Sequence, residues 1–366
     1  MDIQNHSALI ASKIVGKFKE DIPVRSGYSG FFPRETTPTL DVDIQVERDD
    51  DLIATDVVRF TAGNKSKYSK LTEKKFRPPF FKQEYYFAQD DVYLNTVAQG
   101  IMNSSNANNA IAQKGLDAMR RERKKIERAI RKQQGEVLQT GIITLKNGDN
   151  IDFKRKAESI VDLTNSNYWD GNSNPLADIQ KGCKFLREVG NSYGSTVNMF
   201  LRDAGLNALL NNENKALNNA LDTRRMNRAN IVMPQFNDAS GMTFHGQFAA
   251  GDFTINIWTY NEKGTNAETK VTEYYQEEHN AILLPSDFQG KTIMGGLPYL
   301  RKVGKMKVPA VIASEYLIRG WDDEATISST LELTSAPLVV PFTIDKIYTM
   351  KVLEKYKLKN QVRFHS

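Results

Sequence analysis

Residue types that occur in catalytic and binding sites are present in this chain, but their spacing matches no known site. Gly290-Lys291-Thr292 has the form of the end of a phosphate-binding loop. That loop needs a glycine five residues before Gly290, where Pro285 stands. No glycine-rich dinucleotide fingerprint follows a predicted strand. We therefore expect a turn between strands at Gly290.

The histidines and the cysteine show no metal-ligand or nucleophile pattern. None of the four histidines has a second ligand at helix spacing. Glu277-Glu278-His279 could bind a cation, but a solvated loop is the favoured interpretation. Cys183 falls on the apolar face of a predicted helix, which favours a buried structural role. We predict no catalytic residue, no cofactor and no metal, and expect that the protein is not an enzyme. A hydrolase with a scattered site would need a deep pocket with converging titratable groups.

The main electrostatic feature is a basic run on the longest predicted helix, which starts after Asp91 and ends near Gln139. Its apolar residues recur at sums of three and four, which places them on one stripe: Met119, Ile126, Ile130 and Val137. The candidates for contact with DNA phosphates lie on the polar side: Arg121, Lys124, Lys125, Arg128 and Lys132. The alternatives are a solvated helix face and a non-specific nucleic-acid-binding protein that uses residues 120–132.

The elements before this helix predict an arm and a long two-stranded excursion. Residues 1–36 contain the aromatics Phe31 and Phe32, which pack either on the parent domain or on a neighbouring subunit. From Leu40, apolar and acidic residues alternate as in a half-buried strand, and residues 52–60 are predicted as a second strand. Pro78 and Pro79 exclude a central strand where they stand. A two-stranded excursion cannot build its own core, so it needs another surface to lie against.

The rest of the chain mixes helices and strands without a regular strand-helix-strand repeat. Residues 142–153 read as a hairpin, with Asn147-Gly148 as the turn. Asn174 before Pro175 predicts a helix start. Phe253, Ile255, Ile257 and Thr259 alternate as a strand, and residues 279–285 read as another. This order predicts an α+β fold.

Composition excludes several classes of protein. The 366 residues carry a formal net charge of +5 with a pI of about 8.9, which is less basic than a dedicated nucleic-acid binder. The one cysteine permits no intrachain disulfide and fits assembly in a reducing cytoplasm. No stretch of ~20 apolar residues occurs, so no membrane partner is expected. The N-terminal segment lacks the pattern of a signal peptide.

Three short motifs carry a resemblance to a known family. They are LDTRR at Leu221 to Arg225, Trp169-Asp170 with Pro175 and Asp178, and SAPL at Ser335 to Leu338. With the order of the elements, these motifs make the chain resemble the lambda-type major capsid proteins of tailed bacteriophages. The resemblance implies the Hong Kong 97 phage-type capsid fold, in which the SAPL segment precedes a last strand that returns to the peripheral domain.

The resemblance also implies a domain organisation. Residues 1–36 would form an N-terminal arm, 37–90 an extended β-loop, and 91–167 a peripheral domain whose spine is the long helix. Residues 168–334 would form an axial domain, and 335–366 the return strand. The aromatic and acidic candidates for contacts between subunits are Phe31, Phe32, Asp49, Asp50, Asp51, Phe80, Phe81, Tyr85 and Tyr86. The acidic ones would pair with basic residues of a neighbour.

The function that the resemblance implies is structural. The chain would assemble with itself into hexamers and pentamers of an icosahedral phage head around double-stranded DNA, as part of the virion. Relatives with a long helical N-terminal extension use it as a built-in scaffold, and this chain lacks one. We therefore expect a separately encoded scaffolding protein, a portal and, in some particles, a decoration protein as further partners.

Overall fold

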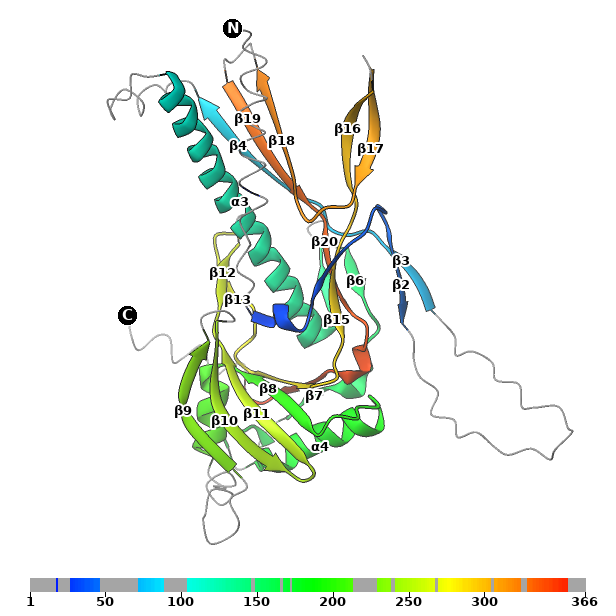
Figure 1. Cartoon of the computed structure of the whole chain (residues 1–366). Coiled ribbons are helices and arrows are strands. Elements are labelled where there is room, and N and C mark those ends of the chain that lie inside the picture. The colour runs from blue at the N-terminus through cyan, green and yellow to red at the C-terminus, as the bar shows by residue number, and fades with distance from the viewer. Residues whose placement is uncertain are drawn as a thin grey trace, which may run out of the picture.

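The computed structural model describes residues 18, 27–46, 72–88, 104–145, 149–164, 167–171, 173–212, 229–237, 241–266, 269–303, 306–323 and 328–354. The fold is α+β, as expected from the sequence. A long helix with two small sheets forms one half, and a larger sheet covered by shorter helices forms the other (Figure 1). No helix in the described ranges is long and apolar enough to cross a membrane.

Helix α3 (Ser104–Thr140) is the spine of the first half. Its 37 residues correspond to a length of roughly 55 Å. The predicted stripe is confirmed, because Met119, Ile126, Ile130 and Val137 are each at most 1% exposed. The helix ends where the sequence suggested: Gly141 adopts a left-handed φ of 73° and donates its N–H to Val137 O.

Two three-stranded sheets accompany α3 (Figure 1). The strands of the outer one, in lateral order, are β18 (Leu317–Asp323), β19 (Ser328–Ser335) and β4 (Phe81–Ala88). The strands of the inner one are β1 (Arg34–Thr36), β15 (Gly290–Met294) and β20 (Pro337–Pro341). Strand β20 is buried throughout and packs on α3.

The second half is a mixed seven-stranded sheet. Its strands, in lateral order, are β7 (Ile160–Asp162), β21 (Tyr348–Lys351), β14 (Asn280–Pro285), β8 (Thr196–Leu201), β11 (Phe253–Tyr260), β10 (Met242–Ala250) and β9 (Ala229–Asn237). Helices α4 (Pro175–Glu188) and α5 (Asp203–Leu210) pack on the sheet over an apolar core that includes Ile179, Cys183 and Leu186. On the opposite face of the sheet, Phe200, Ile282 and Leu284 belong to a second apolar core, which contains the buried stripe of α3 and is called the α3 core below.

Four two-stranded ribbons complete the described part. They are β2 (Val42–Val46) with β3 (Thr72–Phe76), β5 (Ile142–Thr144) with β6 (Asn150–Asp152), β12 (Lys263–Thr265) with β13 (Thr272–Tyr274), and β16 (Leu297–Val303) with β17 (Met306–Ile312). Three short 3-10 turns are η1 (Gly27–Gly30), η2 (Ala157–Ser159) and η5 (Ile344–Lys346). Strands β5 and β6 confirm the predicted hairpin, whereas its Asn147-Gly148 turn lies outside the described residues.

Arg155 joins the two halves at the end of the spine. Its guanidinium donates to Leu138 O at the last turn of α3, to Ser159 in η2 and to Ile347 O before β21. Burial lowers the pKa of Arg155, and the charge of Asp345 acts against that shift. The helix C-terminus, with its negative partial charge, is therefore capped by a cation that also contacts the seven-stranded sheet.

The sheets do not follow the expected boundaries at two places. Strand β4 was expected inside the extended loop of residues 37–90, but it pairs with β19 along its whole length. The last strand, β21, was expected to lie against the spine within the return segment. It contacts the last turn of α3, where the Thr349 hydroxyl donates to Leu138 O at 2.9 Å, but its strand partners are β14 and β7 in the seven-stranded sheet. The strand that returns to α3 is β20 itself, because its five residues are all buried against that helix.

Candidate functional site

The basic face of α3 is the first candidate surface. All five predicted residues are exposed on the side opposite the buried stripe: Arg121, Lys124, Lys125, Arg128 and Lys132. Two of them have acidic partners in the same chain, Lys125 with Glu122 at 2.7 Å and Lys132 with Glu273 at 2.6 Å. For the other three, the described part of the chain shows no ion pair.

The remaining basic residues of this run are used inside the chain. Arg123 is 7% exposed, and its guanidinium lies 4.7 Å from the centre of the Phe18 ring. Arg131 pairs with Glu262 at 3.1 Å, which connects α3 to the segment before β12. A sequence pattern shows that a helix face is basic, but it does not show which charges are neutralised by distant segments.

Phe31 and Phe32, the aromatic candidates for subunit contacts in the N-terminal arm, pack against their own chain. Phe32 is 1% exposed and packs edge-on against Phe288, and Phe31 packs edge-on against Phe200 of the seven-stranded sheet. The arm therefore lies on its own chain at these positions. The Phe32 ring leaves no surface for a neighbouring subunit, which corrects its proposed role. The physical reason is that the two halves leave an apolar gap between them, and these rings fill it.

The predicted subunit-contact residues in and next to β4 lie on both faces of that strand. Phe81 and Tyr85 are half-buried and pack against the α3 core, while Phe80 and Tyr86 are 49% and 54% exposed. This is the alternation of a strand with one covered face. Phe80 and Tyr86 thus remain free to contact another subunit. Asp49, Asp50 and Asp51, and the predicted strand at 52–60, lie outside the described residues.

Strands β2 and β3, at the two ends of the predicted extended β-loop, leave the body as a two-stranded ribbon (Figure 1). Val42 at its root is 4% exposed and belongs to the α3 core, and Phe76 packs against the same core. Beyond this root, no other described strand pairs with either member of the ribbon. Within the described ranges, the ribbon is therefore a two-stranded sheet of its own rather than part of a larger one.

The motifs weighed for chemistry have structural roles. Gly290-Lys291-Thr292 is not a turn but part of strand β15, and the Phe32 ring lies against Gly290 where a phosphate would have to enter. Burial raises the pKa of the Cys183 thiol to about 12, which keeps it unreactive. His279 pairs with Glu277 at 2.9 Å and is buried, so Glu277-Glu278-His279 is not a fully solvated loop. The described residues contain no cluster of ligands that could hold a metal.

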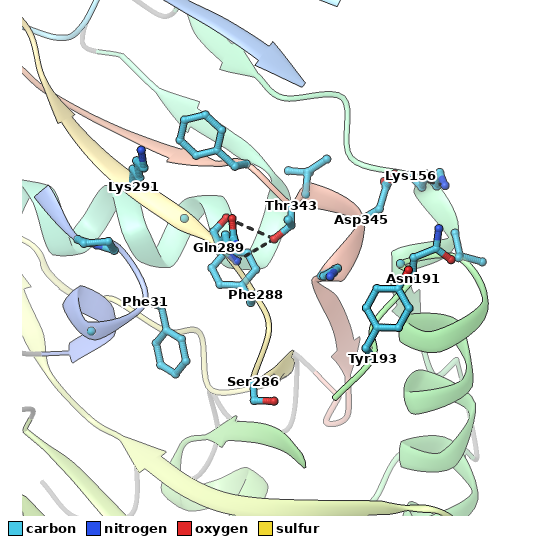
Figure 2. Close-up of a pocket in the computed structure, with 18 of the residues that line it drawn as sticks. Phe31, Lys156, Asn191, Tyr193, Ser286, Phe288, Gln289, Lys291, Thr343 and Asp345 are labelled. Carbon is cyan, nitrogen blue, oxygen red and sulfur yellow. Dashed lines mark hydrogen bonds and ion pairs between the residues drawn. The ribbon is translucent and has the colours of Figure 1, made fainter. Parts of the chain in front are cut away.

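A cavity of about 1180 Å³ opens between η1, the end of α4 and the loop after β14 (Figure 2). Its lysines are paired within the chain: Lys346 with Asp287 at 2.6 Å, Lys156 with Asp345 at 3.3 Å and Lys291 with Glu35 at 2.7 Å. Partial burial acts to raise the pKa of Asp287, but hydrogen bonds from Lys346 and Ser192 lower it overall. Charges that neutralise one another in pairs give no support to a hydrolase.

The comparison with known families decides the identity. Residues 19–352 match the family described as phage major capsid protein E. The chain belongs to this family. The expected resemblance to phage major capsid proteins is therefore confirmed over nearly the whole chain. As a phage capsid protein, it forms shells and is a component of the virion, and it is a structural protein rather than an enzyme.

A solved structure shows the same fold as this capsid protein. The putative capsid protein of a prophage from E. coli CFT073 is 15% identical, with a TM-score of 0.59, over 95% of this chain and 99% of that chain. A phage-related protein from Bordetella bronchiseptica RB50 is 8% identical, with a TM-score of 0.48, over 94% and 96% of the two chains. The mature capsid of bacteriophage PhiM1 is 10% identical, with a TM-score of 0.46, over 90% and 88%. The fold assignment rests on the prophage protein from E. coli CFT073. No protein with a curated description matches the sequence.

Two of the three motifs that suggested the family lie in the core of the capsid protein. Trp169 is fully buried and donates its indole N–H to Asp178 Oδ2 at 3.3 Å, just after the α4 start at Pro175. In the SAPL segment, the Ser335 hydroxyl donates to Glu315 O at 2.8 Å and Leu338 is fully buried in β20. LDTRR, the third motif, lies outside the described residues. The motifs thus mark packing positions, which suits a structural protein.

Proposed function

We propose that this capsid protein assembles into the hexamers and pentamers of an icosahedral head that encloses double-stranded DNA. The observation that carries the proposal is the ribbon β2–β3, which extends from the body and pairs with no other strand in the described ranges (Figure 1). A lone two-stranded ribbon is marginally stable in water, so it is expected to lie on another subunit. Exposed Phe80 and Tyr86 on the neighbouring sheet add apolar surface for such a contact.

The acidic residues of the extended β-loop would direct its contact with a neighbouring subunit. Asp49, Asp50 and Asp51 follow one another in the segment between β2 and β3. Acidic groups in one protruding element and basic groups on a neighbour favour one docking orientation over others. Each exposed pair contributes only ~0–1 kcal/mol, but a shell repeats the contact in every subunit.

Replacement of all three aspartates tests this role. We expect the Asp49→Asn, Asp50→Asn and Asp51→Asn variant to reduce shell formation, measured by sedimentation and electron microscopy, with little change in the urea unfolding of the monomer. A triple variant of exposed carboxylates elsewhere, Asp170→Asn, Asp252→Asn and Glu158→Gln, is the control. Equal losses of assembly and of monomer stability would argue against intersubunit pairing.

The enclosed DNA would contact the shell through phosphates only, because packed DNA has to slide and base-specific contacts would hold it. The supporting residues are Arg121, Lys124 and Arg128, which are exposed on α3 and have no ion pair within the described ranges. Lys125 and Lys132 already have acidic partners and are the weaker candidates. The further partners in this proposal are a separate scaffolding protein, a portal and a decoration protein, with assembly in the host cytoplasm.

Salt dependence tests the DNA contact. Isolated subunits should bind duplex DNA weakly in fluorescence anisotropy, with an affinity that falls steeply with salt. Alanine at Arg121, Lys124 and Arg128 should lower the slope of log K against log salt by up to about 2.7, because each phosphate contact contributes about 0.9. Lys181→Ala with Lys184→Ala on α4 is the control. Tight, salt-insensitive and sequence-selective binding would contradict the proposal and favour a dedicated nucleic-acid-binding protein.

A further inference from the structure

The N-terminal strap, which we define as residues 27–37, lies between the two halves of the subunit (Figure 1). Its first part is η1, which lies beside α3 and packs the Tyr28 ring edge-on against Phe200 and Tyr260 of the seven-stranded sheet. Its second part contains β1, which pairs with β15 in the inner sheet of the α3 half. One short segment therefore contacts both halves.

The chain is anchored on the α3 half on both sides of η1. After η1, all three residues of β1 pair with β15, and Arg34 among them forms the buried ion pair with Glu127 of α3. Before η1, the Phe18 ring packs edge-on against Tyr316 and lies 4.7 Å from the guanidinium of Arg123 on α3. Element η1 is therefore a projection from the α3 half into the other half.

The tip of the strap is attached to the seven-stranded sheet by side chains. Tyr28 is fully buried, and its hydroxyl donates to Gln276 Oε1 at 2.7 Å. The amide of Gln276 donates in turn to Phe200 O at 2.9 Å and to Asn280 O at 3.0 Å, so this acceptor is held by the sheet rather than by the strap. No strand pairing joins η1 to the sheet within the described ranges. The tip can therefore leave without breaking a β-ladder.

Gly27 permits the close approach of the tip to the sheet. Its φ of 66° is left-handed, and a Cβ at this position would lie 2.3 Å from the Tyr260 hydroxyl. A side chain is disfavoured there both by the backbone conformation and by the space. Replacement of Gly27 is consequently a second way to displace Tyr28 without touching its ring.

Next to the tip, the two halves leave room between them. The cavity of about 1180 Å³ is lined by residues of both halves, with Phe31 of the strap on one side and Tyr193 after α4 on the other (Figure 2). Further contacts between the halves lie along the last third of α3, where Arg131 pairs with Glu262, and at its end, where Arg155 binds both. The subunit thus has a joint at the end of α3 and a gap beside the strap.

We propose that η1 is a latch. With Tyr28 docked, the latch fixes the orientation of the seven-stranded sheet relative to α3. With Tyr28 undocked, the sheet turns about the joint at the end of α3, and the cavity gives the room for this movement. Such a hinge needs only a few residues that change their backbone angles. The inference concerns the single subunit and does not depend on the proposed assembly.

Distances between the halves, measured by pulsed electron paramagnetic resonance, test the latch. Spin labels are attached at Arg121→Cys on α3 and at Asp252→Cys between β10 and β11, which are both exposed positions. Cys183 is buried, so protein without the added cysteines should take up no label. We expect one narrow distance distribution with the native strap. In Tyr28→Ala and in Gly27→Ala it should become roughly twice as wide, because a second orientation is populated.

Phe248→Ala is the matched control for lost packing. Phe248 is 1% exposed like the residues of the latch socket, but it belongs to the core between the sheet and α4. This variant should lower stability in urea unfolding as Tyr28→Ala does, and its distance distribution should stay narrow. Equal broadening in both variants would show a general loosening and overturn the latch. An unchanged distribution in Tyr28→Ala and Gly27→Ala would overturn it as well.

Tyr28→Phe decides the case in which the alanine variants do not fold, because it removes only the hydroxyl. The latch should then open more often. Hydrogen exchange of η1, where the Phe31 N–H is bonded to Tyr28 O at 2.9 Å, should become roughly fivefold faster by mass spectrometry. The distance distribution should broaden with it, while exchange of β11 stays unchanged. Unchanged exchange of η1 would overturn the latch. Faster exchange with an unchanged distance distribution would show that the strap only fills space, which overturns it too.

Discussion

Arg34 and Glu127 form an ion pair of 2.5 Å between strand β1 and the middle of helix α3, with side chains only 4% and 6% exposed. Arg34 also pairs with Glu315 at 3.0 Å, and Glu127 accepts a hydrogen bond from the Tyr316 hydroxyl at 2.6 Å. Three segments that are distant in sequence therefore meet at one buried charge network. The nearby carboxylate of Glu127 raises the pKa of Arg34 even though burial acts in the opposite direction.

Removal of one partner should be costly because the other remains buried and charged. We expect Arg34→Met to lower the free energy of unfolding by about 3–5 kcal/mol. The double variant Arg34→Met with Glu127→Met should lose clearly less than the sum of the two single variants, because neither member of this pair is then left buried and charged without the other. Urea unfolding of all four proteins measures this coupling. Additive losses would mean that the two side chains do not depend on each other.

Gly135 should tolerate no side chain. A Cβ at this position would lie 2.0 Å from the carbonyl oxygen of Tyr275, which is backbone and cannot move aside easily. Gly→Ala in an ordinary helix gains ~1 kcal/mol from propensity. Here the overlap should reverse the sign and cost about 1–3 kcal/mol in thermal or urea unfolding. Gly30→Ala, where a Cβ meets nothing within 4 Å, is the matched control.

Ile130 tests the buried stripe of the spine. The side chain is 1% exposed in the α3 core, so Ile130→Ala should cost ~2–5 kcal/mol from lost burial and the resulting cavity. Met306→Ala, at an exposed apolar position, should change monomer stability by no more than about 0.5 kcal/mol. A loss below about 1 kcal/mol for Ile130→Ala in urea unfolding would show that the helix face is accessible to water in solution.

Cys183 should make stability fall at alkaline pH. Burial raises the pKa of its thiol to about 12 in the folded chain, above the ordinary value of ~8.5 in the unfolded chain. Its contribution is therefore fully present below the ordinary pKa and is lost as the pH rises toward 12, by ~1.4 kcal/mol per pH unit. Between pH 8 and pH 10, wild type should lose about 2 kcal/mol more than Cys183→Ala in urea unfolding. Identical pH slopes would show that the thiol is not shielded from water.

The local sequence pattern was sufficient to predict helices and strands whose buried face is marked by regularly spaced apolar residues. The stripe Met119 to Val137 predicted the buried face of α3, and Asn174-Pro175 predicted the start of α4, where the Asn174 side chain accepts from Ala177 N. Alternation from Phe253 to Thr259 predicted β11 and its burial. In each case the physical cause is the period of the backbone, which places residues of one kind on one side.

Contacts between segments far apart in the sequence decided the strand partners and the ion pairs. The pattern of Phe81 to Tyr86 shows a strand but not that its partner is β19, nearly 250 residues away. The lysines of the cavity and Arg131 gain carboxylate partners only through the fold. The exposed ribbon β16–β17 follows no simple alternation, because apolar residues occupy both of its faces. The sequence by itself thus determined the family, the elements and the apolar stripes. Only the tertiary structure decided which charges and rings remain free for another subunit, since that depends on contacts between segments far apart in the chain.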